Sequence, residues 1–121
     1  MGTFWVGCRV ENLNDRTRAA DVDKLLVDSG REMTWIPSGI LEQIGVQPAK
    51  TVEFQMANGT VITREVGFAF VHVAEHFTVD EVVFGEDKDL PLLGARSLEG
   101  LNLRVDSRHK KLVAGGPLLA A

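Results

Sequence analysis

Short segments rich in Val, Phe and Thr follow one another along the chain, separated by clusters of Gly, Asn and Asp. This pattern is typical of a mainly β domain. It predicts extended segments over residues 4–10, 20–27, 33–36, 66–73, 77–84, 103–105 and 111–113. The second segment becomes a continuous apolar run at Leu25, Leu26 and Val27, as expected where both faces of a strand are buried. We therefore expect a strand that crosses the core and ends directly before Asp28.

Two short helices interrupt the β pattern, over residues 38–45 and 95–101. Ser38 is expected to cap the start of the first helix, and Gly45 is expected to end it. The inward-facing residues are Ile40, Leu41 and Ile44 in the first helix and Leu98 and Leu101 in the second. Both helices are too short to form a layer of their own, so the fold class remains mainly β.

Asn58-Gly59 predicts a hairpin within residues 52–64, because Asn-Gly is the strongest short-range signal for a two-residue turn. With that loop, Glu53 faces Arg64, which is a favourable cross-strand ion pair. The same register sets apolar positions of one strand opposite polar positions of the other, so neither face is cleanly apolar. We therefore predict that the hairpin projects from the body of the protein.

The length of 121 residues suits one domain spanning residues 1–121, and the 45% apolar and 25% charged content is close to the globular average. The single cysteine, Cys8, excludes an internal disulfide and is expected to be a small buried residue. The last residues, 115–121, are expected to fray unless they lie at an interface with a partner subunit.

A net charge of −4 without blocks of like charge argues against nucleic acid as a partner. No apolar run approaches the length that spans a bilayer, so no membrane association is expected. The N-terminal residues lack the pattern of a signal peptide, and a cytoplasmic location is the default expectation. No cofactor is expected, and His72 and His76 lack a third ligand that would suggest a zinc site.

Three motifs follow one another: Asp28-Ser29-Gly30 at the end of the buried strand, the hairpin at Asn58-Gly59, and Leu92-Leu93-Gly94 before the second helix. In order, spacing and apolar framing they resemble the retropepsin-like aspartic proteases, the single-lobed family that includes retroviral proteases and many bacterial relatives. The segments WIPSGILEQIGV and LPLLGARSLEGLNLRVD resemble those of bacterial members. The resemblance covers residues 24–113 and implies an acid-protease barrel with a flap hairpin.

The resemblance implies an aspartic endopeptidase, in which a water molecule is activated between two carboxylates that share one proton. Asp28 is the expected catalytic residue. The only near match to a second motif is Asp106-Ser107-Arg108, which lacks the glycine and is interpreted as a turn. The second acid is therefore expected from Asp28 of another copy, in a two-fold symmetric homodimer that acts on a peptide or protein substrate.

The remaining roles also follow from the resemblance. Ser29 and Gly30 would support the pair of acids. The flap and substrate-binding residues would be Met56, Ala57, Asn58, Gly59, Thr60 and Val61. The cleft would be bordered by Arg31, Leu92, Leu93 and Gly94, with the last three packed against the acid strand.

Arg31 departs from the family, which most often has a small residue at this position. The side chain has three interpretations: it points outward and pairs with Glu32 or another surface carboxylate, it recognises an acidic group of the substrate, or it impairs the acids. The last interpretation keeps an alternative function open, in which the same dimeric fold is a non-catalytic peptide-binding or scaffold module.

Overall fold

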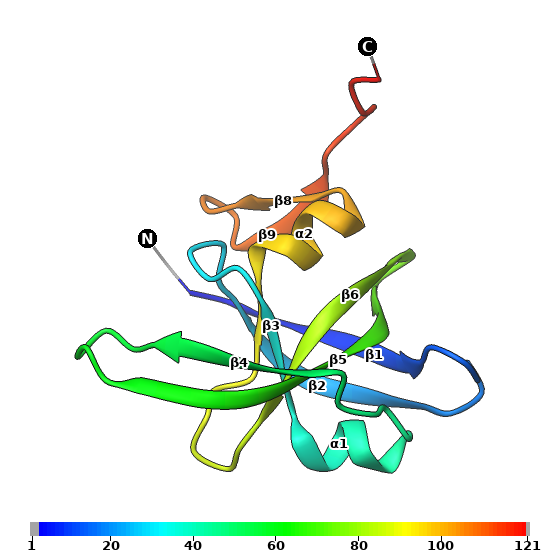
Figure 1. Cartoon of the computed structure of the whole chain (residues 1–121). Helices are drawn as coiled ribbons and strands as arrows, with labels where there is room; N and C mark the ends of the chain where they lie inside the picture. Colours follow the sequence, from blue (N-terminus) through cyan, green and yellow to red (C-terminus); the bar gives the residue numbers. More distant parts are fainter. Residues whose placement is uncertain (1–2, 121) are drawn as a thin grey trace.

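The structure is a computed structural model that describes residues 3–120 (Figure 1). The described chain is mainly β with two short helices, as the sequence predicts. Its elements are β1 (Trp5–Asn12), β2 (Ala19–Val27), β3 (Thr34–Pro37), α1 (Ser38–Gln43), β4 (Lys50–Gln55), β5 (Val61–Val73), β6 (His76–Gly85), β7 (Leu92–Leu93), α2 (Ala95–Leu101), β8 (Leu103–Asp106) and β9 (Lys111–Ala114).

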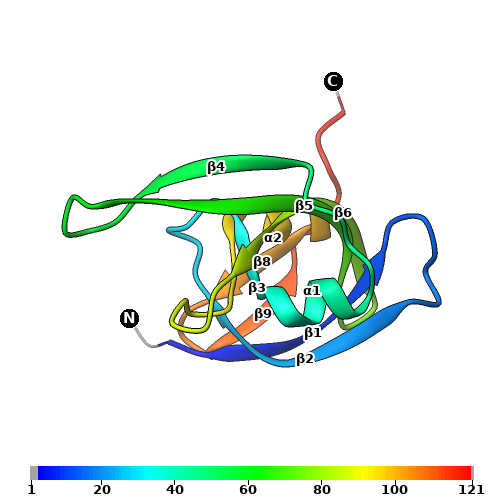
Figure 2. The same cartoon turned by 60° about the horizontal axis from the view of Figure 1, so that its bottom comes forward.

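The large sheet has the strand order β1-β2-β7-β3-β6-β5-β4, and an additional pairing between β1 and β5 closes it on itself. Strand β5 is long enough to pair with two strands along one edge: its first half pairs with β4, and its second half pairs with β1. Along its other edge, the second half of β5 pairs with β6. Because of this division, β4 and the first half of β5 extend away from the barrel (Figures 1 and 2). The expected projection is confirmed, and we call residues 50–66 the projecting hairpin.

The core has two parts. The larger cluster fills the barrel and includes Leu25, Leu41 and Leu93, which are fully buried. The smaller cluster lies under the projecting hairpin and consists of Met33, Trp35, Val66, Val83 and Leu92. Partly buried Leu26, Val52, Phe54 and Ile62 pack against the smaller cluster. The hairpin is therefore anchored to the body through one apolar face.

The predicted register of this hairpin is wrong by one residue. Gln55 pairs with Val61, which leaves a longer loop, and Glu53 faces Thr63 instead of Arg64. The amide of Gly59 donates to the Met56 carbonyl at 2.9 Å, and Gly59 adopts φ +88°, as in a type I turn followed by a left-handed residue. The extra loop residue brings Phe54 opposite Ile62. One face of the hairpin is therefore apolar, whereas the predicted register paired apolar with polar residues.

Both helices lie where the sequence places them, with one correction. Leu41, Ile44, Leu98 and Leu101 are buried as expected. Ser38 is the first residue of α1, whereas Pro37 occupies the N-cap position and no side chain caps the helix. The predicted serine cap is therefore wrong.

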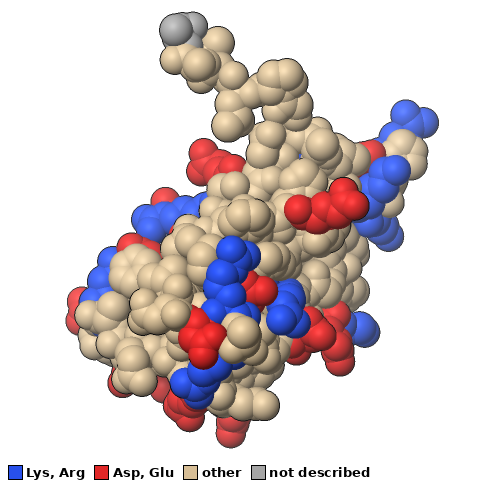
Figure 3. Space-filling model, turned by 90° about the vertical axis from the view of Figure 1, so that its right-hand side faces the viewer, with Lys and Arg blue, Asp and Glu red and all other residues tan. Residues whose placement is uncertain are grey.

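The surface of the described residues carries charges of both signs. Basic and acidic side chains are interspersed over the face that holds the turn between β1 and β2, and the projecting C-terminal tail is uncharged (Figure 3). The tail is held at its start, where the Gly115 amide donates to the Asn102 carbonyl at 2.9 Å, whereas Leu118 and Leu119 are exposed. Residue 121 lies outside the described part. Within residues 3–120, no helix has the length and apolar character needed to cross a membrane.

Candidate active site

Asp28 follows β2 directly and begins a tight turn, residues 28–31, which we call the acid turn. Its backbone amide donates to the Leu93 carbonyl at 3.0 Å, so the parallel pairing of β2 with β7 continues to the acid itself. The carboxylate oxygen Oδ1 accepts a hydrogen bond from the Gly30 amide at 3.0 Å. The Asp28 side chain remains 34% exposed, and Ser29 and Gly30 are exposed. One face of the acid is thus held by the turn while the other is open to solvent.

The motif Leu92-Leu93-Gly94 lies behind the acid turn. Leu92 and Leu93 are fully buried against the acid strand and do not line the pocket described below. A Cβ atom at Gly94 would lie 2.5 Å from the Met33 carbonyl oxygen, so only glycine permits this close approach of backbones. The Ala95 amide then donates to the Arg31 carbonyl at 2.7 Å, which joins the start of α2 to the acid turn.

A buried hydroxyl network supports the same region, and sequence reasoning missed it. The Gly94 amide donates to Thr34 Oγ1 at 3.0 Å, the Thr34 and Ser97 hydroxyls lie 2.6 Å apart, and Ser97 donates to Asp80 Oδ2 at 2.7 Å. Thr34 and Ser97 are fully buried. The sequence gives one sign of this network, a threonine at the start of an apolar strand. The network itself could not be predicted, because Thr34 is far from Asp80 and Ser97 in the chain.

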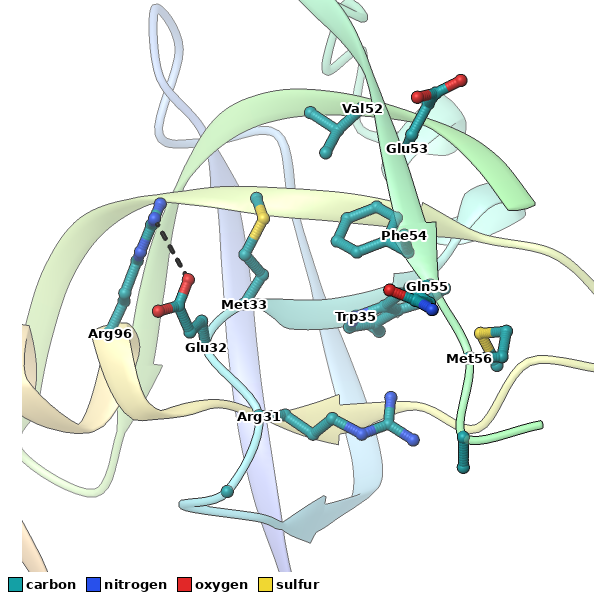
Figure 4. Close-up of a pocket in the computed structure, with 12 residues that line it drawn as sticks. Arg31, Glu32, Met33, Trp35, Val52, Glu53, Phe54, Gln55, Met56 and Arg96 are labelled. Atoms are coloured by element: carbon teal, nitrogen blue, oxygen red, sulfur yellow. Dashed lines mark hydrogen bonds and ion pairs between the residues drawn. The ribbon is translucent and has the colours of Figure 1, made fainter. Parts of the chain in front are cut away.

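A pocket of about 440 Å³ lies between the acid turn and the projecting hairpin (Figure 4). Its lining comprises Gly30, Arg31, Glu32, Met33, Trp35, Val52, Glu53, Phe54, Gln55, Met56, Ala57 and Arg96. The rings of Trp35 and Phe54 pack with their centroids 4.9 Å apart, and Met33 lies beside them. The pocket therefore has an apolar wall beside the acid turn, as ligand-binding pockets commonly have.

Two of the six expected flap residues, Met56 and Ala57, line this pocket. The other four, Asn58, Gly59, Thr60 and Val61, form the exposed tip of the projecting hairpin and do not line the pocket. Asn58 Oδ1 accepts hydrogen bonds from the amide and the hydroxyl of Thr60 at 3.0 and 2.7 Å. The tip is thus ordered by its own polar contacts.

Arg31 points into the pocket, below Met33 and Trp35 and toward Met56 (Figure 4). Its Nε atom lies 3.9 Å from Asp28 Oδ2, and its side chain is half exposed. Glu32 pairs with Arg96 at 3.4 Å, so the outward ion pair between Arg31 and Glu32 is not formed. Arg96 also lies 3.5 Å from Glu81 and lines the pocket.

Other ionisable groups considered from the sequence are engaged elsewhere. Asp106 ends β8 and bonds to the His109 ring at 2.8 Å, so its interpretation as part of a turn is confirmed. His72 lies 3.0 Å from Glu11, and residues 3–120 contain no cluster of three His, Cys, Asp or Glu side chains arranged to hold a metal. Cys8 is buried as expected, and burial raises the pKa of its thiol to about 12.

Comparison with known proteins identifies the fold. The solution structure of the protease of simian foamy virus (mac) matches the chain with a TM-score of 0.52 and 19% sequence identity, over 79% of this chain and 92% of that protein. No protein-family model and no curated protein matches the sequence. The chain thus has the retropepsin-like fold that the three motifs predicted.

Proposed function

We propose that the chain is a homodimeric aspartic endopeptidase of retropepsin type, related to the bacterial members, with Asp28 of each subunit as the catalytic acid. One carboxylate activates water as a general base, and the other, protonated, donates a hydrogen bond to the scissile carbonyl. Ser29 and Gly30 support the acids. The tip of the projecting hairpin, Met56 to Val61, acts as a flap that closes over the substrate and excludes water.

The acid turn carries this proposal. In a retropepsin-like fold, Asp28 is held by backbone bonds from β7 and Gly30, beside a pocket with an apolar wall. A carboxylate that only stabilised a turn would not need to lie next to such a pocket. Its exposed oxygen is available to a water molecule and to a second carboxylate.

Two features support dimerisation. Asp28, Ser29 and Gly30 lie at the surface of the protomer, where a second copy can reach them. The two-stranded sheet of β8 and β9 has no further strand beside it among the described residues, and unpaired edges are ready to pair with another chain. Because one carboxylate cannot supply both the base and the acid, the site is incomplete without the partner.

The test compares native protein with Asp28→Asn on an unfolded protein substrate between about pH 4 and 6. We expect the variant to lose about a thousandfold in cleavage rate, because general acid and general base are both removed. Asp23→Asn, an exposed aspartate on the same strand, is the matched control and keeps full activity. Equal cleavage by native protein and Asp28→Asn contradicts the proposal, and elution at the protomer mass at high concentration contradicts the dimer.

One observation favours the alternative of a non-catalytic peptide-binding module. The Arg31 guanidinium lies 3.9 Å from Asp28 Oδ2, so a cation is already placed beside the carboxylate that the proposed mechanism uses. Arg31→Ala separates the two functions. Activity that is absent in native protein and gained in Arg31→Ala indicates a silenced site, whereas activity present in native protein supports the endopeptidase.

A further inference from the structure

Arg31 has unused hydrogen-bonding capacity inside the pocket. A guanidinium carries five N–H donors. The described residues offer it only the Asp28 carboxylate, at a distance of 3.9 Å that is too long for a hydrogen bond. That contact is made by Nε, while the forked end of the side chain extends toward the hairpin (Figure 4). The geometry that suits a bidentate contact with a carboxylate is therefore free.

The other charged residues of the pocket do not bind the guanidinium of Arg31. Glu32 is paired with Arg96, and Arg96 is shared with Glu81 on β6. Glu53 points away from Arg31, on the far side of Phe54 (Figure 4). An incoming carboxylate would thus meet a guanidinium without a hydrogen bond to the described residues, with Asp28 as the nearest negative charge.

The wall beside Arg31 suits the stem of an acidic side chain. Met33, Trp35 and Phe54 offer an apolar surface to methylene groups. We propose that this pocket selects peptides with a glutamate or aspartate side chain, whose carboxylate is bound by Arg31. This inference rests on the proposed function for the substrate class, but the binding step itself requires no catalysis.

Binding is measured by calorimetry near pH 6, where a free carboxyl side chain is ionised. The probes are octapeptides of alanine and leucine that carry Glu, Gln or Leu at one of the four central positions. The protein is Asp28→Asn, which cannot cleave them under the proposed mechanism. We expect the best Glu peptide to bind at least about tenfold tighter than its Gln counterpart, because a charge-assisted hydrogen bond is lost with Gln.

Three further substitutions on this background locate the effect. Arg31→Gln should reduce the Glu-over-Gln preference to within about twofold, and Arg31→Lys should retain part of it, because lysine keeps the charge without the fork. Arg104→Gln, an exposed arginine on β8, controls for net charge and should leave the preference unchanged. Equal binding of Glu and Gln peptides, or a preference that survives Arg31→Gln, overturns the inference.

The same peptides given to native protein separate this inference from the proposed function. Cleavage without a Glu preference contradicts carboxylate recognition and leaves the endopeptidase intact. An Arg31-dependent preference in binding without any cleavage contradicts the endopeptidase and leaves the recognition intact.

Discussion

Two of the aspartate–arginine pairs in the molecule differ in almost every physical respect. Arg64 and Asp89 form a bidentate pair at 2.7 and 3.0 Å, and their side chains are only 8% and 10% exposed. Arg31 and Asp28 approach to 3.9 Å through a single atom, with side chains that are 51% and 34% exposed. The first pair joins the base of the projecting hairpin to the loop before β7. The second lies beside the pocket.

The difference shows which pair is available for chemistry. Every oxygen of Asp89 is occupied, since Oδ2 also accepts from the Glu86 amide at 2.7 Å, and hydrogen bonds from Arg64 lower the pKa of this carboxyl. Asp28 has one oxygen bound to Gly30 and the other without a hydrogen bond among the described residues. A saturated pair stabilises the fold, whereas an unsaturated pair can accept water, a partner carboxylate or substrate.

The largest expected effect is on the saturated pair. Asp89→Asn should lower the free energy of unfolding by about 3 kcal/mol, because it leaves the buried Arg64 charge with only the exposed carboxylate of Glu86, 3.6 Å away. Chemical denaturation measures the loss, and Asp87→Asn, an exposed neighbour in the same loop, should be nearly neutral. A loss as small as that of Asp87→Asn would remove the contrast between the two pairs.

The backbone packing behind the acid turn, which holds Asp28 and Arg31, should contribute the next largest effect. Gly94→Ala should cost about 2 kcal/mol, since the added Cβ meets the backbone of Met33 and Glu32 and pushes the acid turn away from β7. Gly39→Ala in α1 is the control, because nothing lies within 4 Å of its added Cβ. In thermal unfolding, Gly94→Ala should lower the midpoint temperature, whereas Gly39→Ala should raise it or leave it unchanged.

A third carboxylate extends the comparison to pH. Burial alone would raise the pKa of Glu11, but hydrogen bonds from Arg16, Arg9 and His72 outweigh it and hold this pKa at about 2. The stabilisation is therefore complete above the unfolded pKa near 4.3 and is lost as the pH falls toward 2. The stability difference between native protein and Glu11→Gln should shrink by about 2 kcal/mol between about pH 5.5 and 2.5. A stability difference that stays constant over this pH range would contradict the lowered pKa of Glu11.

The smallest effect is expected where function is proposed. Asp28→Asn should change the free energy of unfolding by less than about 0.5 kcal/mol, because its carboxylate makes one backbone hydrogen bond and one long, exposed ion pair. Denaturation of this variant beside Asp89→Asn provides the direct contrast. A loss comparable with that of Asp89→Asn would assign Asp28 a structural role.

The sequence predicted the parts of this protein that depend on local pattern. The strand that ends directly before Asp28 and the two short helices follow from periodicity and turn residues, and the retropepsin-like fold follows from the family resemblance. The expected burial of this strand on both faces is only partly met, since Leu25 is buried whereas Leu26 and Val27 are half-buried. The hairpin was also predicted, but its register was not. Asn-Gly is compatible with a two-residue turn and with a longer one, and the packing of Phe54 and Ile62 on the smaller core cluster selects the longer.

Only the tertiary structure decided where Arg31 points and what supports the acid turn. Sequence reasoning left three interpretations open for Arg31, and only the structure shows that Glu32, one of its candidate partners, pairs with Arg96 of α2 instead. The Thr34, Ser97 and Asp80 network was equally hidden, since its members come from β3, α2 and β6. Local propensity and hydrophobic period are properties of neighbouring residues, whereas side-chain direction and polar satisfaction are decided by residues far apart in the chain.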